Sequence, residues 1–152
     1  MPYTTADARQ QLLNTVAEAA DSLGGALASL GEAYELLDEG NADRLEEQLF
    51  RPVQSAYGRA RRTHDEFAAR HGLPTRSFEP AVPGAPSKGA KGFLDAAVQA
   101  IVSADHTLAT LQDSMLPVEV GDAELRAGLE QVRELLGRLS ARAHELLRTL
   151  GR

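Results

Sequence analysis

The chain has 152 residues, of which 43% are hydrophobic, 25% charged and 5% aromatic, with a formal net charge of −6. This length suits one domain and is short for two, so we expect a single domain over residues 1–152. The absence of cysteine excludes a disulfide scaffold, a thiol nucleophile and cysteine-ligated metal sites, and the acidic balance argues against nucleic-acid binding.

The first predicted element is a long helix from about residue 5 to residue 39. Its apolar residues recur at alternating steps of three and four, which is the heptad pattern of a coiled-coil seam. This seam comprises Leu13, Val16, Ala20, Leu23, Leu27, Leu30, Tyr34 and Leu37. Gly40 then provides a left-handed stop, and Asn41 is the expected cap of the next helix.

The second predicted helix covers about residues 42–71. Pro52 lies inside its apolar pattern, and because proline lacks an N–H and crowds the carbonyl group of Gln48, we expect a kink there. Gly72 and Pro74 end the helix. The seam comprises Leu45, Leu49, Phe50, Val53, Tyr57, Ala60, His64, Phe67 and His71.

A proline-rich connection, residues 73–87, separates the second helix from the third. It is long enough either to span one end of a bundle or to run back along it. The third helix is expected at about 88–116 and the fourth at about 122–150, with Asp122 as the N-cap of the fourth. The two seams comprise Ala90, Leu94, Ala97, Ile101, Ala104, Leu108, Leu111 and Met115, and Leu125, Leu129, Val132, Leu136, Leu139, Ala143, Leu146 and Leu150.

Four seams of similar length predict an all-α fold, namely an antiparallel up-down-up-down four-helix bundle with left-handed heptad packing. Each helix of about 30 residues would be about 45 Å long. A dimer in which two chains exchange hairpins would have the same pattern, so this alternative stays open.

Two glycines, Gly24 and Gly31, share one heptad position beside the first seam. A glycine inside a helix costs about 1 kcal/mol relative to alanine, so its recurrence calls for a structural reason. Antiparallel pairing about a turn near residue 40 places Gly24 opposite Tyr57 and Gly31 opposite Phe50. We therefore expect rings of the second helix to fill a groove that these glycines leave in the first.

The residue patterns of common catalytic sites are missing from the sequence. It has no Glu-x-x-His motif of a di-iron bundle, no pair of histidines four residues apart and no Gly-x-x-x-x-Gly-Lys-Ser/Thr phosphate loop. Adjacent carboxylates such as Asp65 and Glu66 point to different sides of a helix. We therefore expect no catalytic residues, no metal and no cofactor, and we favour a protein that is not an enzyme.

His64 is the histidine on which the alternatives depend, because it falls on a seam. If small side chains around it leave a cavity, the ligand-binding candidates are His64, Tyr57 and Ser140. The stretch Arg61-Arg62-Thr63-His64-Asp65-Glu66 resembles the phosphoacceptor helix of sensor histidine kinase dimerisation domains. This resemblance implies that His64 is a phosphoacceptor and Asp65 its orienting base.

The expected topology divides the charge unevenly between the two ends of the bundle. The end made of residues 1–20, 59–98 and 138–152 carries a net charge of +5, and the other end carries −11. A small anionic ligand at this basic pole is one expectation. Its candidate residues are Arg61, Arg62, Lys88 and Lys91.

Taken together, these patterns favour a non-catalytic interaction or scaffold protein that binds a protein partner or associates with itself. Apolar positions left outside the seams, among them Leu36, Leu135 and Leu147, would provide the surface. A small-molecule-binding bundle with a pocket near His64 and a phosphotransfer protein are the alternatives. The chain begins without a signal-peptide pattern and has no long apolar run, so we expect a cytoplasmic protein with no membrane partner.

Overall fold

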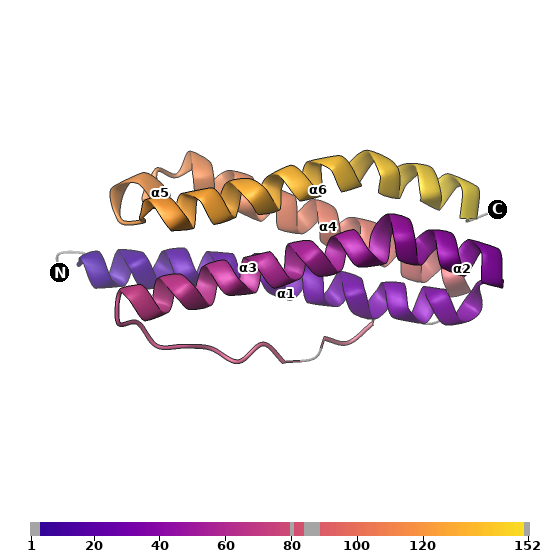
Figure 1. The fold of residues 1–152 in the computed structure, drawn as a ribbon, viewed down its shortest axis with the longest axis horizontal. Coiled ribbons are helices and arrows are strands. Elements are labelled where there is room, and N and C mark those ends of the chain that lie inside the picture. The colour runs from indigo at the N-terminus through magenta and orange to yellow at the C-terminus, as the bar shows by residue number, and fades with distance from the viewer. Residues whose placement is uncertain (1–3, 80, 84–88, 151–152) are drawn as a thin grey trace.

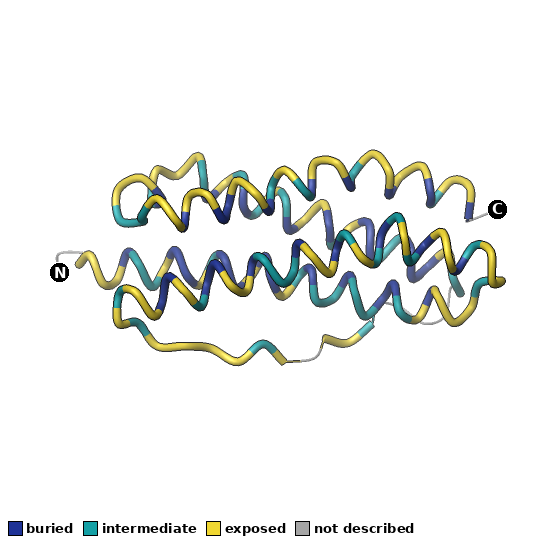
Figure 2. The backbone as a smooth tube through the Cα atoms, in the orientation of Figure 1, coloured by how far each residue is buried: buried dark blue, intermediate teal, exposed yellow. Residues whose placement is uncertain are grey.

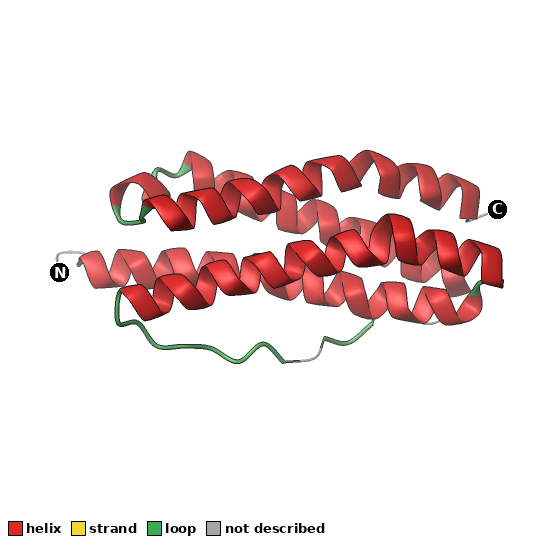
Figure 3. Ribbon diagram, viewed as in Figure 1, coloured by secondary structure: helices red, strands yellow, loops and turns green. Residues whose placement is uncertain are grey.

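The computed structural model describes residues 4–79, 81–83 and 89–150. Over these residues all regular structure is helical (Figure 3), which confirms the all-α prediction. The elements are α1 (Thr5–Leu36), α2 (Glu39–Leu45), the π-helical turn η1 (Glu46–Phe50), α3 (Arg51–Arg70), α4 (Gly89–Asp113), α5 (Leu116–Glu119) and α6 (Ala123–Leu150).

The long helices lie side by side, but the directions in which successive helices run differ from the prediction (Figure 1). Near the start of α1, Arg9 donates a hydrogen bond to the carbonyl oxygen of Val120, which follows α4 and α5, at 3.0 Å. At the end of α3, Arg70 pairs with Asp122, which directly precedes α6. Both α3 and α4 therefore end where α1 and α6 begin, and the expected up-down-up-down order is wrong.

The cause is the route of the connection between α3 and α4. Its length allowed two routes, and its described part runs back along α1 and α3 instead of crossing one end (Figure 1). In the resulting order, α1 packs extensively on α3 and α4, and α6 packs extensively on the same two helices. All four of these pairs are antiparallel.

One cluster of buried apolar side chains, to which every long helix contributes, forms the core (Figure 2). On α1 the buried stripe includes Ala19, Ala26 and Ala33, one position before the predicted seam, while Tyr34 of that seam is 37% exposed. Leu13, Val16, Ala20, Leu23 and Leu30 of the predicted seam are also buried, so the buried face of α1 is wider than predicted, because α1 packs most extensively on α4 as well as on α3. Small side chains allow two helices to approach closely, and α4 contributes Gly92, Ala97 and Ala104 to its own buried face.

The turn between α1 and α2 is capped earlier than predicted. Asp38, not Asn41, is the N-cap of α2, and its carboxylate accepts a hydrogen bond from the backbone N–H of Asn41 at 3.4 Å. Gly40 lies inside α2. An aspartate is a good cap and its charge complements the helix N-terminus, which accounts for the earlier start. Gly72, in contrast, has a φ of +64° and ends α3 as predicted.

The irregularity predicted at Pro52 takes the form of the π-helical turn η1 just before it. Proline has no N–H to donate to the carbonyl oxygen of Gln48, and that oxygen instead accepts from the guanidinium group of Arg142 at 3.4 Å. A π turn contains one residue more than an α-helical turn. The buried face continues through the irregularity, since Leu45 before η1, Leu49 within it and Val53 after it are all buried.

Gly128 of α6 is a packing residue that the seam analysis missed. A Cβ atom at this position would overlap the hydroxyl oxygen of Thr63 and lie 2.8 Å from its methyl carbon. Thr63 is buried on α3, and its hydroxyl group donates to the carbonyl oxygen of Arg59 at 2.8 Å. The close approach of α3 and α6 therefore depends on the missing side chain of Gly128.

We predict that Gly128→Ala lowers the free energy of unfolding by about 1–2 kcal/mol, because overpacking outweighs the gain in helix propensity. Gly137→Ala on the same helix is the matched control, since no described atom lies within 4 Å of its added Cβ, and it should raise stability by up to about 1 kcal/mol. Urea denaturation of both variants measures the effect. Equal changes in the two variants would contradict the close contact with Thr63.

Asp122 joins the end of α3 to the start of α6, and its role as the N-cap of α6 is confirmed. Its carboxylate accepts from the backbone N–H of Leu125 at 2.7 Å, from the guanidinium of Arg70 at 2.8 and 2.9 Å, and from the imidazole of His71 at 2.9 Å. Partial burial acts to raise the pKa of Asp122, but these hydrogen bonds outweigh it and hold the pKa well below its ordinary value. The hydrogen bond between Arg70 and Asp122 also raises the pKa of Arg70.

We predict that Asp122→Asn lowers stability at pH 7 by about 1–3 kcal/mol, since asparagine keeps the cap but loses the charge. A depressed folded pKa stabilises the protein fully above the unfolded pKa of about 3.9, and this contribution is lost as the pH falls below it. The stability gap between the parent chain and the variant should therefore narrow below about pH 4. Denaturation from pH 7 to pH 3 tests this, with Asp113→Asn on an exposed carboxylate as control. A gap that is independent of pH would contradict it.

Candidate functional site

Residues 73–79 and 81–83 form an extended segment, here called the strap, which lies beside α1 and α3 (Figure 1). Most of these residues are exposed (Figure 2). The guanidinium group of Arg76 pairs with the carboxylate of Asp21 on α1 at 2.7 Å. Ala81 lies against α1 as well, because a Cβ added at Gly24 would stand 3.9 Å from that of Ala81. The strap thus occupies part of the groove between α1 and α3.

Phe78 is the aromatic anchor of the strap. The guanidinium carbon of Arg61 lies 5.2 Å from the centre of its ring, and that of Arg76 lies 5.1 Å away. The ring also meets the imidazole of His64 in an edge-to-face arrangement, with ring centres 5.3 Å apart. Cation–π contacts at partly exposed sites contribute about 0.5–1 kcal/mol each, so the strap is fixed by several modest interactions around one ring.

His64 is buried, as its place on the seam predicted, with 2% of its surface exposed. Its Nδ1 atom lies 3.0 Å from a carboxylate oxygen of Asp65, and Phe78 lies against the ring. A phosphoacceptor imidazole must reach a phosphate donor in solution. The burial of His64 therefore argues against the role that the kinase resemblance implies.

The three ligand-binding candidates do not come together. Tyr57 and His64 both lie on α3, while Ser140 lies on α6. Because Arg59 bonds to Gln131 and Arg142 bonds to the carbonyl of Gln48, Ser140 lies beside the start of α3. His64 lies two turns or more further along, next to Thr63 and its contact with Gly128.

The anion-binding candidates are also separated, because the basic pole depended on the up-down-up-down order. Arg61 and Arg62 are exposed on α3, and the guanidinium of Arg61 lies over the rings of Tyr57 and Phe78. Lys91 is in the first turn of α4, at the opposite end of the molecule from the end of α3 (Figure 1). Lys88 lies outside the described residues.

Of the two predicted contacts between a ring of the second helix and a glycine of the first, the one between Tyr57 and Gly24 is present. A Cβ added at Gly24 would lie 3.4 Å from the ring of Tyr57. A surface cavity at this level is lined by Asp21, Gly24, Tyr57, Arg76, Glu79 and Ala81, so both helices and the strap contribute to it. The groove is therefore filled here by an aromatic ring of α3 and by residues of the strap.

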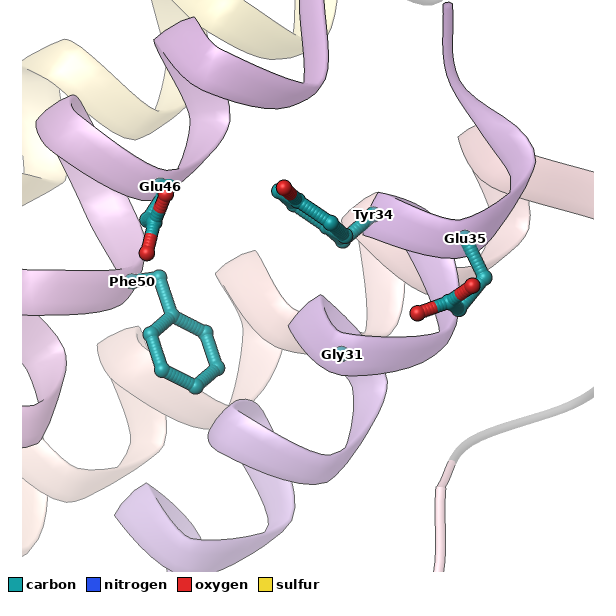
Figure 4. Close-up of a pocket in the computed structure, with 5 residues that line it drawn as sticks. All are labelled: Gly31, Tyr34, Glu35, Glu46 and Phe50. Carbon is teal, nitrogen blue, oxygen red and sulfur yellow. The ribbon is translucent and has the colours of Figure 1, made fainter. Parts of the chain in front are cut away.

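One heptad further along α1, the same groove is open. No described atom lies within 4 Å of a Cβ added at Gly31, so Phe50 does not fill the space as predicted. A cavity of about 290 Å³, here called the open groove, is lined by Gly31, Tyr34, Glu35, Glu46 and Phe50. Figure 4 shows Tyr34 and Phe50 projecting from facing elements into the space between α1 and η1. Tyr34 is therefore 37% exposed at the groove, and Phe50, although it is partly packed against the core, also borders it.

The surroundings of the open groove are acidic. Residues 31–50 contain seven carboxylates and one cation, Arg44. Among the described residues, neither Glu35 nor Glu46 forms an ion pair with a basic side chain. Two exposed or half-buried aromatic rings therefore line one cavity, together with two carboxylates that have no basic partner in the described part of the chain. Sequence reasoning located Gly31 and Phe50, but it assigned Tyr34 to the core and missed both glutamates.

Comparisons with protein-family models, with curated proteins and with solved structures found no match. Over the described part of the chain, no group of three or more His, Cys, Asp or Glu side chains is arranged to hold a metal ion. None of the described helices combines the length and the apolarity needed to cross a lipid bilayer.

We predict opposite outcomes for leucine at the two levels of the groove. Gly24→Leu should lower stability by about 1–3 kcal/mol, because its side chain would be forced against Tyr57 and Ala81. Gly31→Leu should leave stability unchanged or raise it by up to about 1 kcal/mol, because it meets no described atom and leucine favours the helix. Denaturation midpoints at equal m-values measure both. A loss of stability in Gly31→Leu would show that the second level is already filled.

Proposed function

We propose that this chain is a non-catalytic interaction protein and that it binds a protein partner at the open groove. The observation that carries the proposal is the pair of rings, Tyr34 and Phe50, which face a cavity of about 290 Å³ that no described residue fills, between two helical elements. Aromatic side chains set in a surface hollow are characteristic anchors of protein interfaces. Filling the hollow would remove their apolar surface from water, which is favourable by about 25 cal/mol per Å².

A further exposed apolar side chain lies at the end of α1. Leu36, the last residue of α1, is 56% exposed, but it does not line the open groove, because side chains two residues apart on a helix point in different directions. Leu36 was one of the apolar positions from which the sequence favoured an interaction protein. The other two, Leu135 and Leu147 on α6, are half-buried against the core and add less. Of these three leucines, Leu36 therefore exposes the most apolar surface.

The long helices hold the two sides of the open groove in place. We propose that they pack with the left-handed heptad geometry of coiled coils. The support is a series of seven among the buried positions on α1, which are spaced by alternating steps of four and three. These are Leu12, Val16, Ala19, Leu23, Ala26, Leu30 and Ala33.

Site-specific photocrosslinking in the cells that produce the protein tests the proposal. Replacing Tyr34 by the photoreactive residue p-benzoylphenylalanine keeps an aromatic ring at the groove. We expect this variant to form a discrete covalent adduct with another protein on irradiation. The matched control carries the same residue at Val102, which is exposed on α4, and should form none. No adduct at position 34, or the same adduct at both positions, would contradict the proposal.

A further inference from the structure

The strap shows what kind of chain segment the groove between α1 and α3 accepts. At the level of Gly24, the groove holds an extended segment and not a helix. That segment brings one cation, Arg76, to a carboxylate of α1, Asp21, at 2.7 Å. It places a small apolar side chain, Ala81, over the glycine.

The open groove repeats these features one heptad away. Gly31 lies seven residues after Gly24 on α1. On the facing side, Phe50 at the end of η1 lies seven residues before Tyr57 on α3. Carboxylates are again present, and here there are two, Glu35 from α1 and Glu46 from η1. What differs is the occupant, because no described residue of the strap lines this second cavity.

We infer that the open groove binds an extended, cationic segment of the partner protein. This inference rests on the proposed function and specifies the chemistry of the partner. An arginine or lysine of the segment pairs with Glu35 and Glu46, as Arg76 pairs with Asp21. A neighbouring apolar side chain enters the space above Gly31, between Tyr34 and Phe50. Two carboxylates without a basic partner among the described residues favour a segment with more than one positive charge.

The charge around the cavity supports a cationic occupant over an acidic or purely apolar one. Residues 31–50 carry a large acidic excess, so an approaching basic segment is attracted and an acidic one is repelled. The strap itself carries Glu79 two residues before Ala81. A segment with a cation at the position of Glu79 would complement the acidic open groove better than the sequence of the strap does.

A synthetic peptide tests the inference on the full chain. The probe is a fluorescein-labelled peptide with the sequence of residues 75–82 carrying E79K, and binding is followed by fluorescence anisotropy. We expect saturable binding that weakens as salt is added, because exposed charges are screened. Gly31→Leu fills the cavity and should weaken binding about tenfold or more. E35K and E46K should each weaken it severalfold and reduce its dependence on salt.

Matched variants separate the open groove from other surfaces. Gly137→Leu makes the same substitution at an exposed helical glycine of α6 with no described atom nearby, and it should leave binding unchanged. Circular dichroism checks that each variant is folded. Binding that survives Gly31→Leu, or that Gly137→Leu weakens equally, would overturn the inference. Binding lost in Tyr57→Ala but kept in Gly31→Leu would place the peptide on the strap's level and overturn it too.

Failure of this inference differs from failure of the proposed function. If the peptide does not bind while position 34 still forms its adduct, a protein partner docks there with another chemistry, and the extended cationic segment is wrong. If the peptide binds as expected but no adduct forms in cells, the groove has the inferred chemistry and the proposed function is wrong.

Discussion

The antiparallel packing of α1 on α4 is the interaction on which the rest of the structure depends. Small side chains on both helices let them approach closely, and this pair is the most extensive in the molecule. Because α3 also packs antiparallel to α1, α3 and α4 must run in the same direction. The chain therefore has to travel the length of the molecule between them, and the strap is the described part of that return.

The open groove follows from the same arrangement. The buried face of α1 extends toward α4 and leaves Tyr34 at its exposed edge, and the π turn before Pro52 ends with Phe50 on the facing side of the groove. The strap covers the groove at Gly24 but, in its described residues, not at Gly31. A tight pair of helices on one side of α1 thus leaves an incompletely filled groove on the other.

Periodicity predicted what depends on local sequence, and failed where two arrangements satisfy the same pattern. The helices, the cap at Asp122, the stop at Gly72 and the contact of Gly24 with Tyr57 all follow from spacing and residue type. The order of the helices does not follow from the sequence, because the proline-rich connection is long enough either to cross one end of the bundle or to run back along it. The exposure of Tyr34 does not follow from it either, since the predicted seam and the positions one residue earlier, such as Ala33, have the same periodicity. Gly128 was missed because its reason lies in Thr63, on a different helix.

The return path of the strap also bears on how the chain folds. The hairpins α1–α3 and α4–α6 join segments close in sequence, whereas the large α1–α4 interface joins segments separated by the whole of α3 and the connection. Loop closure of this kind costs entropy before any contact is gained, and non-local contacts slow folding. We expect the two hairpins to form early and their docking to limit the rate. Contacts that hold Phe78 and Arg76 against α1 and α3 shorten the free loop between α3 and α4, which lowers the entropy cost of closing the α1–α4 interface.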